Sequence, residues 1–294
     1  MRILITGGDG MLGHQLLLSL QHRHDVRVTL RQAMNQYKSY NLFTTANSYS
    51  EIDVRDENKL LNVLADFKPE AVINAVGIVK QRKSAKEVIP SLEINALFPH
   101  RLSEMCQSIN ARMIHLSTDC VFSGSKGKYR ENDPSDAIDL YGKTKYLGEV
   151  QSPHCVTLRS SIIGLELARN TGLIEWFLAQ QEQIKGFKRA IYSGFTTQEM
   201  SRLIETILVK HPDLSGVWHV ASEAINKYDL LQIFCTMLDR KKIPIEPDEV
   251  FICDRSLNGD AFKKATGYQA PHWNKMLREL ADQVNQRNNC QETA

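Results

Sequence analysis

The sequence predicts an α/β protein with a doubly wound, parallel sheet and a smaller α/β lobe in its C-terminal part. An apolar, β-branched run at residues 2–6 ends in glycines, and apolar residues then recur at helical spacing over residues 11–20. Short apolar runs and helical segments continue to alternate as far as residue 159. Right-handed crossovers between such strands cover both faces of a parallel sheet with helices.

The other elements of the first region follow from the same two periodicities. We expect strands at residues 26–30, near Ile52, and at 71–74, 112–116 and 155–159. We expect helices at residues 58–67, 92–109 and 141–150. The strand at 155–159 is expected to extend the same sheet.

After Gly164 the alternation loosens, and we place a boundary there between residues 1–164 and a smaller lobe of residues 165–294. In this lobe we expect helices at residues 171–183, 198–209 and 227–238, a short strand at 217–220 and a proline-containing stretch at 243–247. Some of the lobe is expected to cross back to the first region. The polar tail, residues 285–294, is expected to fray.

The composition is that of an ordinary globular protein and argues against several functional classes. Lys and Arg exceed Asp and Glu by only 36 to 34, so the net charge of +2 gives no reason to expect a nucleic-acid partner. The cysteines form no CxxC pair and the histidines form no HExxH, so we expect free thiols and no catalytic metal. The chain starts directly with a strand, and no apolar run approaches the roughly 18 residues of a membrane span. We therefore expect a cytoplasmic protein without a membrane partner.

The turn between the first strand and its helix, TGGDGMLG, has the spacing of a dinucleotide-binding site. Gly7 allows a tight turn, Gly10 lets backbone amides approach a pyrophosphate, and Gly13 lets the helix pack closely on the strand. We include Met11 and Leu12 among the cofactor-binding residues. Residues 1–164 are therefore expected to form a Rossmann-type, dinucleotide-binding region.

The residues that follow the next strands predict which dinucleotide binds. Arg31 ends the second strand, where a carboxylate favours NAD and an arginine accommodates the 2′-phosphate of NADP. It predicts NADPH, with NADH as the second choice; the alternative is an arginine that only meets solvent. Asp53, followed by Val54, is expected to accept a hydrogen bond from the adenine amino group.

The fourth strand ends in small residues, in the segment INAVG. Asn74, Ala75 and Gly77 leave space for the second ribose and the phosphates of the cofactor. We expect these residues to line the middle of the cofactor site.

Tyr141 and Lys145 open the helix expected at 141–150, and residues four apart lie on the same helical face. A phenol ionises near pH 10, and a fixed ammonium nearby can lower its pKa by about 1–3 units. We therefore predict Tyr141 as a general acid that protonates a carbonyl oxygen while a nicotinamide delivers hydride to the carbon. Thr118, which follows the strand at 112–116, is expected to hold that oxygen.

In this order, the segments TGGDGMLG, INAVG, HLSTDCVFSG, YGKTK and LRSSIIG resemble extended short-chain dehydrogenases of the dTDP-4-dehydrorhamnose reductase type. The match is good over residues 1–165 and weaker beyond. It implies the NADPH-dependent reduction of the keto group of a nucleotide-activated 4-keto-6-deoxy sugar, as in deoxysugar and polysaccharide biosynthesis. It also implies Thr118, Tyr141 and Lys145 as the catalytic set, with Lys145 holding the nicotinamide ribose and Asn95 beneath the site.

The resemblance further implies that residues 165–294 bind the sugar nucleotide. The expected substrate contacts are Val79, Ser117, Asp119, Cys120, Asn170, Trp176 and Lys188. Cys120 departs from the usual pattern, because the rhamnose-type reductases carry tyrosine there, whereas GDP-fucose synthase, which epimerises before it reduces, has a catalytic cysteine. No histidine lies between Ser160 and Trp176 to pair with Cys120, so we expect a packing role for this thiol.

Two other functions stay open from the sequence. An epimerase of the same fold would keep its nicotinamide bound, and Arg31 argues against it because such epimerases usually hold NAD. A protein resembling the regulatory subunit of methionine adenosyltransferase would hold a dinucleotide without turning over a substrate. The sequence leaves the oligomeric state open, a homodimer included.

Overall fold

The computed structural model describes residues 1–80, 86–168, 170–238 and 243–292. Its centre is a sheet of seven strands in the order β11-β6-β5-β4-β1-β2-β3, with every neighbouring pair parallel. The strands are β1 (Arg2–Thr6), β2 (Asp25–Thr29), β3 (Ser48–Tyr49), β4 (Ala71–Asn74), β5 (Arg112–Leu116), β6 (Cys155–Arg159) and β11 (Gly216–His219). The predicted fold class is confirmed.

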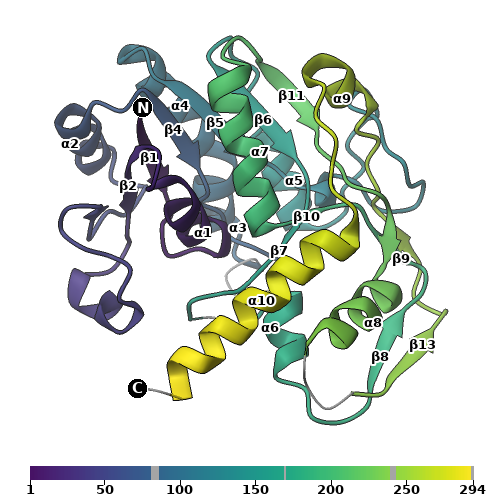
Figure 1. Ribbon diagram of the computed structural model, residues 1–294. Coiled ribbons are helices and arrows are strands. Elements are labelled where there is room, and N and C mark those ends of the chain that lie inside the picture. The colour runs from purple at the N-terminus through teal and green to yellow at the C-terminus, as the bar shows by residue number, and fades with distance from the viewer. Residues whose placement is uncertain (81–85, 169, 239–242, 293–294) are drawn as a thin grey trace.

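Alternate residues of β1 point to two separate cores, which is why the sheet is covered on both faces. Ile3 and Ile5 pack in one cluster with α1 (Met11–Leu20) and α7 (Thr197–Lys210). Leu4 packs in another with α2 (Glu57–Phe67) and α4 (Phe98–Ser108). Figure 1 shows α1 and α7 in front of the sheet and α4 behind it.

Two elements of this region differ from the prediction. The third strand lies at Ser48–Tyr49 rather than near Ile52, whose amide instead donates to the Leu30 carbonyl beyond the strand. The helix expected at 92–109 begins earlier, at α3 (Val88–Ser91), and passes through a π-helical segment, η3 (Leu92–Leu97), before α4. Within η3 the Asn95 amide binds both backbone groups of Ile78, at 2.9 and 3.0 Å.

The expected strand at 217–220 is β11, and it joins the large sheet by pairing with β6. Together with α7 it forms the part of the chain that crosses back to the first region. Gly164 therefore marks a boundary in the sequence only, because residues 197–219 follow it but pack with the first region.

The rest of the second lobe consists of small sheets and helices beside the large sheet (Figure 1). Its sheets pair β10 with β7, β9 with both β12 and β14, and β13 with β8. The strands are β7 (Ile162–Ile163), β8 (Ile184–Phe187), β9 (Ala190–Tyr192), β10 (Phe195–Thr196), β12 (Ile225–Asn226), β13 (Ile245–Asp248) and β14 (Cys253–Asp254). The helices are α6 (Leu173–Leu178), α8 (Lys227–Met237), α9 (Asp260–Thr266) and α10 (Trp273–Glu292). The helix expected at 171–183 is thus only six residues long, because β8 follows closely.

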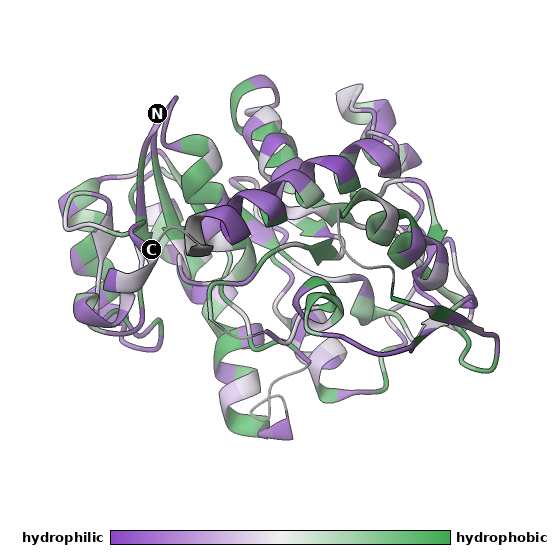
Figure 2. Ribbon diagram, turned by 60° about the horizontal axis from the view of Figure 1, so that its bottom comes forward, coloured by the Kyte–Doolittle hydropathy of each residue, from purple (hydrophilic) through white to green (hydrophobic). Residues whose placement is uncertain are grey.

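The expectation of a frayed tail was wrong over residues 285–292, which continue α10. This helix is largely hydrophilic along its length in Figure 2, yet it buries a stripe that includes Trp273, Leu277 and Leu280. Near its end Arg287 pairs with the buried Glu175 of α6, at 2.6 Å. Side-chain packing and this ion pair therefore hold a helix that its polarity alone would not predict.

Within the described residues, no helix is both long and apolar enough to cross a membrane. The same residues contain no group of three or more His, Cys, Asp or Glu side chains arranged to bind a metal ion. Five cysteines in the described part are free thiols.

Candidate active site

The turn between β1 and α1 is shaped to receive an anion. Gly7 has a φ of +80°, which favours glycine, and a Cβ atom on Gly13 would lie 2.0 Å from the Gly7 carbonyl oxygen. Gly10 is the N-cap of α1, and among the described residues no side chain caps this end. The first-turn amides, including those of Met11 and Leu12, are therefore available to a ligand.

Gly8 belongs to the same turn, although the sequence analysis gave it no role. A Cβ atom on Gly8 would lie 2.5 Å from the Cβ of Val28 on β2. The Gly8 amide also donates to the Thr29 carbonyl at 2.9 Å. Gly8 is thus needed for the turn to sit against β2, a contact that the sequence spacing does not reveal.

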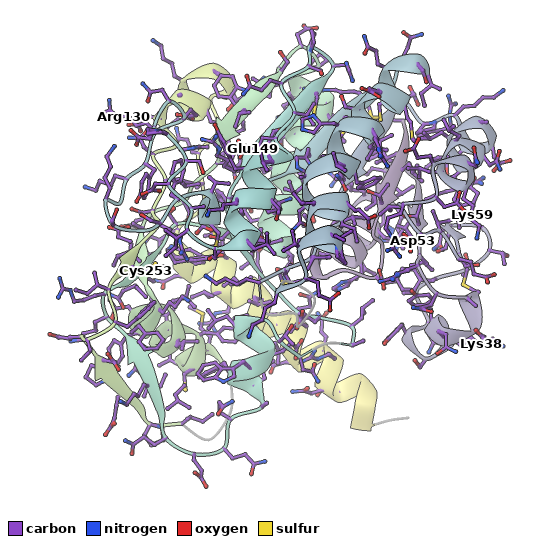
Figure 3. The ribbon with its side chains drawn as sticks, turned by 180° about the vertical axis from the view of Figure 1, so that it is seen from behind. Lys38, Asp53, Lys59, Arg130, Glu149 and Cys253 are labelled. Atoms are coloured by element: carbon purple, nitrogen blue, oxygen red, sulfur yellow. The ribbon has the colours of Figure 1, made fainter. Side chains whose placement is uncertain are left out.

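The side chains beyond β2 form a small charged group at the periphery of the molecule, where Figure 3 labels Asp53. Arg31 is 59% exposed, and its Nε lies 3.9 Å from Asp53 Oδ2. Arg55, to which the sequence analysis gave no role, donates to both carboxylate oxygens of Asp53, at 3.0 and 2.7 Å. These bonds, against the effect of burial, lower the pKa of Asp53 to about 2. Val54 is partly buried and packs against the core.

Hydrogen bonds of the buried Asn74 side chain hold the end of β4 in place. The Asn74 Oδ1 atom accepts hydrogen bonds from Thr6 Oγ1 and from the Val76 amide, both at 3.1 Å. Its amide nitrogen lies 3.1 Å from His115 Nδ1. Since the Asn74 side chain is turned inward, it is the backbone around Ala75 and Gly77 that lies along the sheet edge.

Thr118 and Tyr141 are brought together by close packing of two short helices. Thr118 caps η4 (Asp119–Val121) by accepting the Cys120 amide at 3.1 Å, and Asp139 caps α5 (Leu140–Leu147) by accepting the Gly142 amide at 2.8 Å. A Cβ atom on Gly142 would lie 2.1 Å from the Cys120 carbonyl oxygen. A glycine after the tyrosine therefore lets α5 approach η4, and Tyr141 hydrogen-bonds the Thr118 hydroxyl.

Lys145 lies on the next turn of α5 and is 4% exposed. Its ammonium donates to the Leu116 carbonyl at the end of β5, at 2.6 Å. Burial lowers the pKa of Lys145 to about 8, although the charge of Glu149 acts in the opposite direction. Lys145 therefore stays mostly protonated at neutral pH.

The predicted lowering of the Tyr141 pKa was wrong for this state of the protein. Burial is the main effect that raises the pKa of Tyr141 above its ordinary value, and the nearby Cys120 adds to it. The hydrogen bond with Thr118 acts in the opposite direction. The Lys145 ammonium donates to the Leu116 carbonyl, and its charge does not outweigh the loss of solvent around the phenol. Tyr141 is thus a fully protonated phenol at neutral pH, as a proton donor has to be.

Cys120 lies beside this pair and is also protonated. Burial, and then the charge of Asp119, raise the pKa of its thiol to about 12, while Arg255 acts in the opposite direction. A thiol of this kind supplies little thiolate for removing a proton from carbon. The packing role expected for Cys120 stays a prediction.

The remaining expected substrate residues are dispersed. Ser117 and Asp119 turn inward, because Ser117 donates to Glu149 at 2.6 Å and Asp119 accepts from Ser161 at 2.7 Å. Lys188 lies beyond β8, over the Tyr228 ring and 3.8 Å from Glu249. The residues left with exposed or half-buried side chains are Val79 after β4, Asn170 before α6 and Trp176 on α6.

Two further charged groups lie at this site: Arg255, which the sequence did not suggest, and Lys80, which belongs to a basic stretch expected to include contacts to a diphosphate. Arg255 follows β14 in the second lobe and donates its Nε to the Phe122 carbonyl at 2.8 Å. Lys80 follows β4 and pairs with Asp139 at 2.6 Å. No local pattern marks Arg255, because it reaches η4 across more than a hundred residues of sequence.

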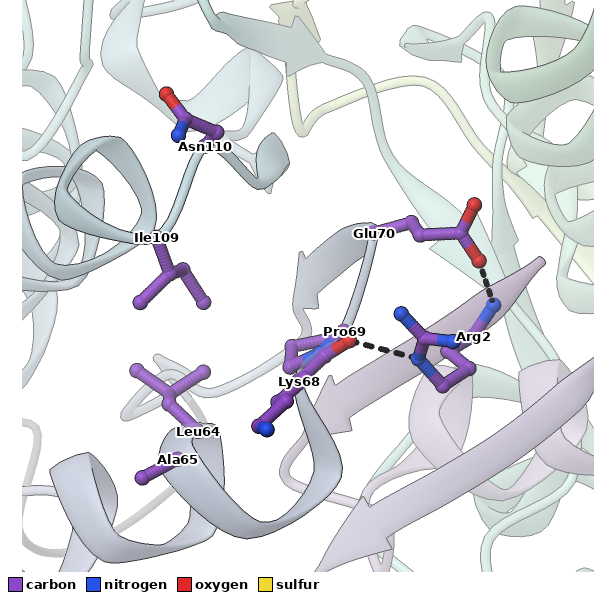
Figure 4. A pocket seen from close by; sticks show the side chains of 8 residues that line it. All are labelled: Arg2, Leu64, Ala65, Lys68, Pro69, Glu70, Ile109 and Asn110. Carbon is purple, nitrogen blue, oxygen red and sulfur yellow. Dashed lines mark hydrogen bonds between the residues drawn. The ribbon is translucent and has the colours of Figure 1, made fainter.

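A surface hollow elsewhere on the molecule does not belong to this site. It lies at the starts of β1 and β4, which is the opposite edge of the sheet from Thr118 and Tyr141 (Figure 4). Its lining residues are Arg2, Leu64, Ala65, Lys68, Pro69, Glu70, Ile109 and Asn110. In open α/β sheets ligands bind at the carboxyl ends of the strands, so we place the active site there.

Comparison with known proteins gives the family. The model described as the RmlD substrate binding domain matches residues 1–286. The chain belongs to this RmlD family. The dTDP-4-dehydrorhamnose reductase of Aggregatibacter actinomycetemcomitans is 27% identical over 305 residues, which cover 95% of this chain and 98% of that protein.

Two further similarities bear on the alternatives. Methionine adenosyltransferase 2 subunit beta of Bos taurus is 30% identical over 152 residues, 50% of this RmlD-family chain and 41% of that protein. The crystal structure of dTDP-4-dehydrorhamnose reductase from Bacillus anthracis in complex with NADP has a TM-score of 0.77 at 20% identity, covering 95% of this chain and 98% of that one. The second similarity confirms the fold.

Proposed function

We propose that this chain uses NADPH to reduce the keto group of a nucleotide-activated 4-keto-6-deoxy sugar. The observation that carries the proposal is the group of Thr118, Tyr141 and Lys145 at the carboxyl edge of the sheet, where the glycine turn also opens. The similarity to dTDP-4-dehydrorhamnose reductase over nearly the whole of both chains supports this substrate class.

The residues present fit a dinucleotide. The first-turn amides from Met11 and Leu12 onward suit its pyrophosphate, with Gly7 and Gly10 shaping the turn and Gly13 letting α1 pack closely against it. Arg31 would meet the 2′-phosphate of NADPH, and NADH would lack that contact. Asp53 would face the adenine, the backbone from Asn74 to Gly77 the middle of the cofactor, and Lys145 the nicotinamide ribose.

When bound, the reduced nicotinamide supplies the hydride. Tyr141 then gives its phenolic proton to the carbonyl oxygen of the sugar as that oxygen gains charge. Thr118 hydrogen-bonds the same oxygen, and the Lys145 ammonium stabilises the phenolate that Tyr141 becomes. The raised pKa keeps Tyr141 protonated at neutral pH but also makes the phenol a weaker acid, so proton transfer depends on stabilisation of the phenolate by Lys145.

We assign the sugar nucleotide to the region where this site faces residues 165–294. Arg255 and Lys80 bring positive charge for its diphosphate, while Val79, Asn170 and Trp176 offer contacts for the sugar and the base. We retain the cytoplasm as the location, since the described thiols are free, and we retain a homodimer as the arrangement to test.

The test is NADPH oxidation by the purified chain with a panel of sugar nucleotides. Rapid oxidation with a 4-keto-6-deoxy sugar nucleotide, and none with the 4-hydroxy sugar, is the expected result. A second candidate function is a regulatory subunit that binds dinucleotide without turnover, which the similarity to methionine adenosyltransferase 2 subunit beta favours over half of the chain. Tight NADPH binding, with no NADPH oxidation in the presence of any keto-sugar nucleotide, would support that second function instead.

A further inference from the structure

A buried cluster of polar groups lies directly behind the catalytic residues. Its centre is Glu149, labelled in Figure 3, which follows α5. Arg159 on β6 donates to both of its oxygens, at 2.8 and 2.7 Å, and Ser117 donates to one of them at 2.6 Å. The Glu149 and Arg159 side chains are only 3% and 5% exposed.

The far side of the cluster ends in a neutral histidine. His219 Nδ1 lies 3.0 Å from the Tyr129 carbonyl, so this nitrogen carries the proton and donates it. His219 Nε2 is then free to accept from Arg159, at 3.1 Å. Burial, and then the charge of Arg159, lower the pKa of His219 to about 4. The guanidinium is therefore held on two sides, by Glu149 and by a neutral imidazole.

The near side of the cluster is bonded to the same end of β5 as Lys145. The lysine ammonium binds the Leu116 carbonyl, and Glu149 binds the side chain of the very next residue, Ser117. Both groups are thus fixed to the same end of β5, and they lie four positions apart in sequence. A Cβ atom on Gly148 would lie 1.9 Å from the Asn95 carbonyl oxygen, so the segment that carries Glu149 can pack here only with glycine at this position.

We infer that Glu149 is a positioning residue for the reduction, whose fixed negative charge keeps the buried Lys145 in its ammonium form. The inference rests on the proposed function for its catalytic meaning, because only a charged lysine can stabilise the phenolate of Tyr141. Burial alone favours neutral lysine, and Glu149 is the group whose charge opposes that effect. Ser117 and Arg159 hold the carboxylate in place.

The other charged or titratable groups around Lys145 do not replace this effect. His115 on β5 is buried, and its pKa is lowered well below the ordinary value, so it is neutral. Glu93 on η3 faces Arg55 at 3.6 Å, and Asp119 on η4 accepts from Ser161. Tyr141 is a protonated phenol, and Arg159 is positive and would favour neutral lysine.

The experiment measures the ionisation of Lys145 without any turnover. The chain is labelled with carbon-13 at lysine Cε, the Lys145 signal is assigned as the one lost in Lys145→Met, and its shift is followed against pH. Glu149→Gln is expected to lower the midpoint by about one pH unit. The matched control is Glu199→Gln, which removes another buried carboxylate that pairs with an arginine, Arg202 at 2.8 Å, and should leave the midpoint unchanged.

Loss of Glu149 leaves the buried Arg159 without its counter-charge, so the single variant can fail to fold. In that case Glu149→Gln combined with Arg159→Met removes both charges, and a smaller downward shift is expected. An unchanged or raised midpoint in either folded variant overturns the inference. If the parent reduces keto sugars, its reduction rate should fall at high pH. In Glu149→Gln this fall should begin at a lower pH, by the same amount as the shift in the NMR midpoint. A downward shift in the NMR midpoint without any reductase activity would keep the electrostatic role and reject the proposed reaction.

Discussion

The preference for NADPH depends on the charge of Arg31, and Arg31→Asp tests it. Two unit charges 4 Å apart interact by about 1 kcal/mol in bulk water and by about 4 kcal/mol at an effective dielectric constant of 20. The Arg31 side chain is 59% exposed, so the lower value applies. Reversing the charge at residue 31 replaces an attraction of about 1 kcal/mol with a repulsion of the same size. The binding free energy then changes by about 2 kcal/mol, which corresponds to roughly a 30-fold loss of NADPH affinity. NADH affinity should change little, because NADH has no 2′-phosphate.

The assay is a titration of each cofactor by calorimetry, at low and at high salt. The difference between parent and Arg31→Asp should shrink as salt rises, since exposed charges are screened. Arg23→Asp is the matched control, because Arg23 is 61% exposed but precedes β2, at the opposite edge of the sheet. The reasoning fails if the parent binds NADPH and NADH equally, or if both variants weaken NADPH to the same extent.

Further predictions concern the catalytic residues and the glycine turn. Tyr141→Phe should fold and bind NADPH normally but lose about 10²–10⁴-fold in single-turnover NADPH oxidation, the usual contribution of a positioned acid; a parental rate would refute the mechanism. Lys145→Met should weaken both turnover and NADPH binding, which a cofactor titration of the same protein would show; unchanged binding would contradict its contact with the ribose. Cys120→Ser should keep its rate, and the parent should place no solvent deuterium on the carbons beside the keto group, as judged by mass spectrometry; deuterium that disappears in Cys120→Ser would indicate an epimerase. Gly13→Ala should abolish cofactor binding, because its Cβ would lie 2.0 Å from the Gly7 carbonyl oxygen; a parental dissociation constant would show that the turn can move.

Much of the fold could be predicted because its signals are local. The periodicities of β1, α1, β4 and β5 predicted the type of each element correctly. They also predicted its ends to within a residue, since each segment buries a regular face. The same holds for the glycine turn and for Tyr141 and Lys145, whose spacing alone places them on one face of a helix.

The elements that were misplaced depend on partners elsewhere in the chain. The third strand lies at Ser48–Tyr49 because those residues pair with Val28 and Thr29, which no pattern around Ile52 shows. Residues 285–292 stay helical because α10 packs on the second lobe and Arg287 reaches Glu175. In both cases tertiary contacts override a weak local preference.

By itself, the sequence determined the parallel α/β fold and the glycine turn, and it predicted which groups would be catalytic. Only the tertiary structure decided their electrostatic states: the pKa of Tyr141 is raised, Lys145 faces the Leu116 carbonyl, and Glu149 is fixed by Arg159. The physical reason is that burial and long-range charge pairs set the ionisation of a group, and neither leaves a periodic trace in the chain. The approach of Arg255 to Cys120 was equally invisible, since the two residues lie far apart in the sequence.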